Sequence, residues 1–177
     1  MPEKVLVTYA TKYGSTQGVA EVIAAELRNM GLDADLLPAA NVQSISGYHA
    51  VVLGTPLYIG SMLSDASKFL SRFKKEISEI PSALFVLGPL YNTPKDMTDA
   101  KTQLDIILNK ITWFKPVTVE VFTGAMDPDK FRFPDSLLKM MPASQTGDIF
   151  KKFDGRDWDA IKSWSSTLEN VLLKQTA

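Results

Sequence analysis

Residues 5–16 read Val-Leu-Val-Thr-Tyr-Ala-Thr-Lys-Tyr-Gly-Ser-Thr, and this is the most informative stretch of the chain. A short apolar run stops in a patch of hydroxyl residues around one glycine, and a helical pattern begins at Gln17. A strand, a tight polar loop and a helix start form a phosphate site, because the first N–H groups of a helix lack internal partners and the helix dipole adds partial positive charge there. Gly14 lets the backbone come close to such a ligand.

The amino-acid sequence of this loop excludes three common kinds of phosphate site. The chain contains no Gly-Lys pair and therefore no P-loop. Only Gly14 and Gly18 follow the first strand, which does not make the glycine fingerprint of dinucleotide-binding folds. The strand ends in Thr8, Tyr9 and Ala10, without the acidic residues of a phospho-receiver domain. A hydroxyl-rich loop for a terminal phosphomonoester, such as that of FMN, remains.

The loop resembles the phosphate loop of flavodoxins, in which a hydroxyl residue, a Thr or Tyr, a glycine and a second hydroxyl residue recur at this spacing. The resemblance implies FMN as cofactor and a phosphate held by Thr11, Lys12, Tyr13, Gly14, Ser15 and Thr16. The alternative interpretation is a plain polar turn that caps the following helix.

Composition bounds the class of protein. The 177 residues suit one domain with a sizeable core. The net charge of −1 lacks the basic excess that is typical of nucleic-acid-binding proteins. The absence of cysteine excludes disulfides and thiolate catalysis, and with a single histidine the chain offers no evident metal site. The apolar runs are strand-length, and no signal peptide is evident before the first strand, so we expect a cytoplasmic protein.

Hydrophobic periodicity predicts five strands that alternate with helices. The predicted strands are Val5–Thr8, Asp33–Leu37, Ala50–Leu53, Ala83–Leu87 and Pro116–Phe122, and the predicted helices are Thr16–Met30, one capped by Ser64, Asp96–Lys110 and Asp157–Lys174. This alternation predicts an α/β flavodoxin-like three-layer sandwich with a five-stranded parallel sheet of order 2-1-3-4-5. Ligands of such sheets bind outside the carboxyl ends of the strands, where the order reverses between strands 1 and 3.

Two further loops leave these carboxyl ends, Gly54–Leu63 and Gly88–Pro94, and each carries glycine, proline and one tyrosine. A flavin ring needs flat apolar faces and backbone groups along its polar edge. The cofactor-binding residues predicted here are Pro56, Leu57, Tyr58, Ile59, Gly60, Gly88, Pro89, Leu90, Tyr91 and Asn92. The alternative for each tyrosine is a half-exposed loop side chain.

A segment of about thirty residues, roughly 125–156, separates the last strand from the last helix and is too long for an ordinary crossover. Three short stretches resemble the quinone-coupled protoporphyrinogen IX dehydrogenase family. They are Gly124-Ala125, Arg132-Phe133-Pro134-Asp135 with the Leu-Leu-Lys-Met that follows, and Asp157-Trp158. This resemblance implies FMN, a quinone-like or other hydrophobic electron partner, and peripheral contact with the inner face of a membrane. The alternative is a structural flap with Phe131, Phe133, Met140 and Met141 as its core.

Three functions stay open from the sequence. The first is an FMN-dependent oxidoreductase of the protoporphyrinogen dehydrogenase type, with catalytic residues unknown. The second is a non-enzymatic flavodoxin that carries electrons between redox proteins, which the near-neutral charge and Lys12 in the phosphate loop disfavour. The third is a flavodoxin-shaped binding domain without flavin.

Overall fold

The computed structural model describes residues 1–58, 60–89, 93–142, 144 and 151–173. Ile59, Leu90, Tyr91 and Asn92, four of the predicted cofactor-binding residues, lie outside the described residues.

Five parallel strands form the central sheet in the order β2-β1-β3-β5-β6. Numbered in chain order among the parallel strands, this is 2-1-3-4-5, so the predicted order is confirmed. The strands are β1 (Lys4–Tyr9), β2 (Asp33–Pro38), β3 (Ala50–Tyr58), β5 (Ser82–Leu87) and β6 (Thr118–Phe122). The inner strands are apolar on both faces because helices cover both sides of the sheet.

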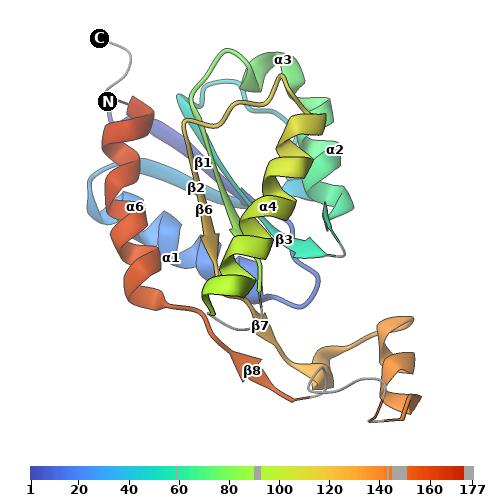
Figure 1. Ribbon diagram of the computed structural model, residues 1–177. Coiled ribbons are helices and arrows are strands. Elements are labelled where there is room, and N and C mark those ends of the chain that lie inside the picture. The colour runs from blue at the N-terminus through green and yellow to red at the C-terminus, as the bar shows by residue number, and fades with distance from the viewer. Residues whose placement is uncertain (59, 90–92, 143, 145–150, 174–177) are drawn as a thin grey trace.

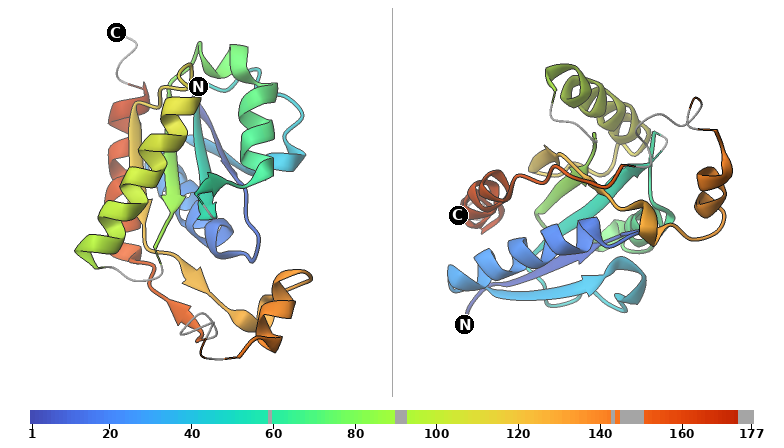
Figure 2. Two further views of the ribbon diagram at one scale, coloured as in Figure 1. Left: turned by 45° about the vertical axis from the view of Figure 1, so that its right-hand side comes forward. Right: turned by 90° about the horizontal axis from the view of Figure 1, so that it is seen from below.

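The helices form two outer layers (Figure 1; Figure 2). On one face lie α1 (Ser15–Asn29) and α6 (Trp158–Leu173), which pack against each other and against β1, β3 and β5. On the other face lie α2 (Ser64–Arg72), α3 (Lys74–Ile77) and α4 (Pro94–Lys110). One turn of 3-10 helix, η1 (Ala39–Asn41), follows β2. No described helix has the length and apolar character that crossing a membrane requires.

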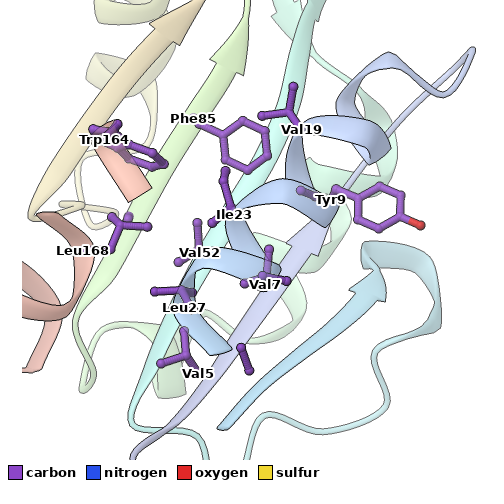
Figure 3. Packing of buried hydrophobic residues seen from close by; sticks show 14 of the residues in the cluster. Val5, Val7, Tyr9, Val19, Ile23, Leu27, Val52, Phe85, Trp164 and Leu168 are labelled. Atoms are coloured by element: carbon purple, nitrogen blue, oxygen red, sulfur yellow. The ribbon is translucent and has the colours of Figure 1, made fainter. Parts of the chain in front are cut away.

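The first core layer shows how the strands and helices interlock (Figure 3). Ile23 and Leu27 of α1 pack on Val7 and Val52, and all four side chains are fully buried. Phe85 lies at the centre, 6.2 Å from the ring of Trp164 in α6. Apolar positions on the helices at spacings of three and four therefore meet alternate positions on the strands, which holds the carboxyl ends of the strands in place.

Strand β3 is longer than predicted, so the expected loop from Gly54 to Leu63 is wrong in its first half. Residues 54–56 stay in register with residues 85–87 of β5. The chain then folds back in β4 (Ser61–Met62), which pairs antiparallel with the end of β3. Proline and glycine suggested a loop, but Pro56 and Gly54 lie within β3. A Cβ on Gly54 would lie 2.0 Å from the Phe85 ring, so the glycine makes room for the core.

Smaller predictions also fail at helix starts. Ser64 is the first residue of α2 and makes no capping hydrogen bond, whereas Thr93 caps α4 by accepting from the backbone N–H of Asp96 at 3.1 Å. Trp158, the first residue of α6, is 37% exposed.

The segment between β6 and α6 projects beyond the carboxyl edge of the sheet (Figure 1). It leaves through β7 (Ala125–Met126) and returns through β8 (Phe153–Asp154), which pair antiparallel. Between them lie two 3-10 turns, η2 (Pro128–Lys130) and η3 (Asp135–Met140). The alternative of a flap core fails for Phe133 and Met140, which are 80% and 82% exposed. We call residues 125–156 the insert.

Candidate functional site

The loop between β1 and α1 has the backbone of a phosphate site. Gly14 adopts the left-handed conformation (φ +92°), and a Cβ there would meet nothing within 4 Å, so its conformation, not space, favours glycine. The N–H of Gly14 donates to Oγ1 of Thr11 at 2.9 Å. Thr16, in the first turn of α1, is fully buried, and its Oγ1 has no hydrogen-bond partner among the described residues.

This orphaned hydroxyl is the observation that tests the fit of a phosphate group. Buried polar groups are normally paired, and an unpaired one costs about 1–3 kcal/mol. A hydroxyl beside the unpaired N–H groups of a helix start is suited to donate to a phosphate oxygen. The loop residues therefore fit a flavin phosphate.

A cavity of about 340 Å³ lies next to this loop, at the carboxyl ends of β1, β3 and β5. Its volume is within the usual range for small-molecule sites, and its walls are largely apolar. It is lined by Lys12, Tyr13, Ser15, Pro56, Leu57, Tyr58, Leu87, Gly88, Gly124, Ala125, Met126, Phe131 and Asp135. We call it the central cavity.

The predicted site residues are only partly gathered here. Seven of them line the central cavity: Lys12, Tyr13, Ser15, Pro56, Leu57, Tyr58 and Gly88. Pro89 lines a second cavity of about 340 Å³ that meets the first at Leu57 and Gly88 and reaches α4. Gly60 instead lines a groove between α2 and α4, away from the central cavity.

One carboxylate oxygen gathers three donors on the wall of the central cavity. Oδ2 of Asp135 accepts from Nζ of Lys12 at 2.5 Å, from the hydroxyl of Tyr58 at 3.2 Å, and from the hydroxyl of Tyr13. Nζ of Lys12 also lies 3.3 Å from the Tyr58 hydroxyl and 4.3 Å from the centre of its ring. The ring of Tyr13 packs on Phe131 at 5.2 Å, which adds an apolar contact between loop and insert.

These contacts set the charge of the cluster. The hydrogen bonds from Lys12 and then Tyr13 hold the pKa of Asp135 below its ordinary value, despite partial burial. Burial alone would lower the pKa of Lys12, but the hydrogen bonds with Asp135 and Tyr58 outweigh it and raise that pKa. Burial and the Asp135 hydrogen bond raise the pKa of Tyr13. At neutral pH the cluster thus holds the Lys12 ammonium, the Asp135 carboxylate and the neutral Tyr13 phenol.

A smaller cavity of about 200 Å³ lies on the other side of the phosphate loop and is bordered by three basic side chains, those of Lys130, Lys152 and Arg156. Arg156 donates from Nη1 to the carbonyl oxygen of Ser15 at 3.2 Å and pairs with Asp154 at 2.5 Å. Its guanidinium lies 4.7 Å from the centre of the Trp158 ring. The end of the insert is therefore tied to the start of α1.

Sequence reasoning missed Leu87 and the insert residues of the central cavity, because no local pattern places an insert against a loop more than a hundred residues away. One sequence signal could have identified three of these residues. Gly124, Ala125 and Asp135 belong to the short stretches that resemble the protoporphyrinogen dehydrogenase family. Within the described ranges, no group of three or more His, Cys, Asp or Glu side chains is placed to hold a metal ion.

Comparison with known proteins gives the family and the fold of the chain. The chain is 24% identical to the quinone-type protoporphyrinogen IX dehydrogenase of Escherichia coli strain K12, over 98% of both chains. Among solved structures, a short-chain flavodoxin associated with a bacterial microcompartment matches 99% of each chain with a TM-score of 0.58 at 13% identity. Flavodoxin 1 from Bacillus cereus matches 96% of this chain and 99% of its own, with a TM-score of 0.56 at 14% identity.

The rubredoxin oxygen:oxidoreductase of Desulfovibrio gigas has a TM-score of 0.57 at 17% identity, and the match covers 99% of this chain but 38% of that protein. These structural matches establish the fold. The model of the flavodoxin domain family matches residues 6–149, which is most of the chain. The chain therefore belongs to the flavodoxin domain family.

Proposed function

We propose that the chain binds FMN and works as an oxidoreductase of the protoporphyrinogen dehydrogenase type, with a quinone-like acceptor. The observation that carries the proposal is the buried, unpartnered hydroxyl of Thr16 beside an apolar cavity walled by an insert. A phosphate site and a ring-sized apolar cavity at the carboxyl edge of the sheet are the two parts that FMN needs. The relationship to the E. coli enzyme over nearly the whole chain supports this reaction type.

Different residues of this chain would then bind the phosphate, flank the flavin ring and shield it from water. Thr11, Thr16 and the first backbone N–H groups of α1 would hold the phosphate. Pro56 and Leu57 from β3, with Met126 from β7, line the central cavity and would flank the ring. The flavin supplies the two-electron chemistry when bound. The insert forms the outer wall of the cavity and would shield the ring from water, which favours transfer to a small partner.

The apolar character of this wall supports a quinone-like electron partner. In the overall reaction, a reduced substrate gives up two electrons and two protons, and a quinone takes them up as a hydroquinone. A quinone is flat, apolar and carries two acceptor oxygens, which suits a cavity with apolar walls and a few convergent donors. Four exposed apolar side chains, which we call the tip of the insert, support peripheral contact with the inner face of a membrane, in which lipophilic quinones dissolve: Phe133, Leu137, Met140 and Met141.

An anaerobic reductive titration of the FMN-loaded protein, followed by visible absorbance, tests this proposal. We expect direct passage from oxidised to fully reduced flavin, followed by reoxidation when a quinone is added. A persistent long-wavelength band of one-electron-reduced flavin, without quinone turnover, would instead favour a carrier that docks on redox proteins. Protein that stays colourless after addition of FMN would favour a flavodoxin-shaped binding domain without flavin.

A further inference from the structure

Three donors from the body of the protein converge on one point in the central cavity, and an acceptor from the insert occupies that point. The donors are the ammonium of Lys12 and the hydroxyls of Tyr13 and Tyr58. The acceptor is one oxygen, Oδ2 of Asp135. All four residues line the central cavity. We propose that Lys12, Tyr13 and Tyr58 form a subsite for an oxygen of the electron acceptor, and that Asp135 fills this subsite until the acceptor arrives.

The chemistry of the donors selects the ligand. An ammonium and two phenols present only N–H and O–H donors toward the shared point, so the matching group is an oxygen with full or partial negative charge. Phe131 of the insert packs on Tyr13 beside these donors, so the part of the ligand next to its oxygen must be apolar. A quinone carbonyl on a fused ring meets both requirements, and this assignment rests on the proposed function.

Among the described residues, most insert side chains close to Asp135 in sequence are exposed, which makes the contact of Asp135 able to exchange. Asp135 is 8% exposed, whereas Phe133, two residues earlier, and Leu137, two residues later, are 80% and 50% exposed. The Tyr13–Phe131 ring contact lies next to the same cluster. An acceptor oxygen that takes over the three donors would therefore release the Asp135 carboxylate into water without the loss of a buried core.

Whether removal of Asp135 strengthens or weakens ligand binding distinguishes competition with the ligand from a purely structural role. If Asp135 were only a structural strap, its removal would loosen the cavity wall and weaken ligand binding. If Asp135 competes with the ligand, its removal must strengthen binding, because the donors become free. Asp135→Asn keeps the size of the side chain and removes the charge. Asp129→Asn is a matched control, because this substitution removes the same charge from the same insert. The Asp129 side chain is 89% exposed and contacts Lys139 instead of the cavity.

The experiment measures the affinity of menadione, a naphthoquinone, for the oxidised FMN-loaded full chain by equilibrium dialysis. We expect Asp135→Asn to bind menadione about tenfold more tightly, the ratio that one charge-assisted hydrogen bond represents. Tyr58→Phe added to Asp135→Asn should remove most of this gain, and Asp129→Asn should match the wild type. Equal or weaker binding by Asp135→Asn would overturn the subsite. A gain in FMN affinity without a gain for menadione would also overturn it, because the oxygen would then belong to the flavin.

A second measurement needs no flavin and separates failure of this inference from failure of the proposed function. Trypsin cleaves after lysine and arginine, and Lys130 and Arg132 lie in the insert close to Asp135. In the ligand-free chain, we expect Asp135→Asn to be cut there at least severalfold faster than the wild type or Asp129→Asn. Equal rates in a folded protein would show that Asp135 does not hold the insert on the three donors.

Discussion

At the residue scale, the hydroxyls of the phosphate loop are the groups with the clearest expected role. We expect Thr11→Ala combined with Thr16→Ala to weaken FMN binding by at least tenfold, since a hydrogen bond to a charged phosphate contributes about 1.5 kcal/mol or more. Titration of flavin fluorescence measures this. Thr8→Val is the matched control, because Thr8 also has a buried, unpartnered hydroxyl but lies on β1, outside the loop. Unchanged affinity in the double variant would remove the phosphate assignment.

We expect a second residue cluster, which lies outside the central cavity, to contribute to stability. The hydroxyl of Tyr48 donates to Oδ2 of Asp35 at 2.6 Å, and Nζ of Lys4 lies 3.1 Å from the same oxygen. Burial, with the Asp35 hydrogen bond, raises the pKa of Tyr48 to about 12. The hydrogen bonds from Tyr48 and Lys4 lower the pKa of Asp35.

The signs of these pKa shifts predict a pH profile. The raised tyrosine pKa stabilises the fold fully below the ordinary value of 10.0, and this contribution is lost as the pH rises through about 12. The lowered aspartate pKa stabilises the fold above its ordinary value of 3.8, and this contribution is lost as the pH falls below that value. Tyr48→Phe should cost about 1 kcal/mol at neutral pH.

Urea unfolding at several pH values checks this profile. The wild type should lose stability through the alkaline window, and Tyr48→Phe should show a flatter decline there. A variant as stable as the wild type at neutral pH, with the same alkaline slope, would contradict the contribution of this hydrogen bond.

At the scale of elements, β7 and β8 of the insert form a two-stranded sheet of their own, apart from the central sheet. Met126 pairs with Phe153 across β7 and β8, so the two strands can be joined directly after that pair. We expect replacement of residues 127–152 by Asn-Gly, which favours a tight hairpin, to keep the fold and FMN binding while quinone turnover is lost. Unfolding and FMN titrations, together with a quinone assay, measure the three properties. Full quinone turnover without these residues would show that the insert is only a flap.

At the scale of the whole molecule, the insert projects from the body of the protein (Figure 2), and its tip carries exposed apolar side chains. Phe133, Leu137, Met140 and Met141 are all exposed there, with Arg132 and Lys139 beside them. Basic and apolar side chains together favour binding to an anionic lipid surface. We expect the chain to sediment with vesicles that contain anionic lipid, and more weakly at high salt.

The combined variant Phe133→Ser with Met140→Ser tests the tip as the membrane contact. Partition into vesicles should fall at least tenfold, because burial of each large apolar side chain contributes about 1.5–3 kcal/mol. Ile106→Ser is the control, since Ile106 is 52% exposed on α4, away from the insert. Equal losses in both variants would indicate general adhesion of apolar side chains, and no loss in either would exclude the tip.

Sequence patterns alone were enough to predict the order of the parallel strands and the strand–loop–helix arrangement around residues 11–16. Both depend on local patterns: apolar runs of strand length, helices with one apolar face, and a glycine within a run of hydroxyl residues before a helix. The spelling of the insert also pointed to the correct group of relatives. These features can be predicted from the sequence because each depends only on residues within one turn or one strand of each other.

Only the tertiary structure decided the rest of the site. The continuation of β3 through Gly54 and Pro56 depends on the partner strand β5 and on the Phe85 ring, which no local signal reveals. The contact of Asp135 with Tyr13 joins residues 122 positions apart in the chain. Such contacts depend on how the sheet and the insert pack in space, so the cavity wall and its proposed acceptor subsite emerged only from the fold.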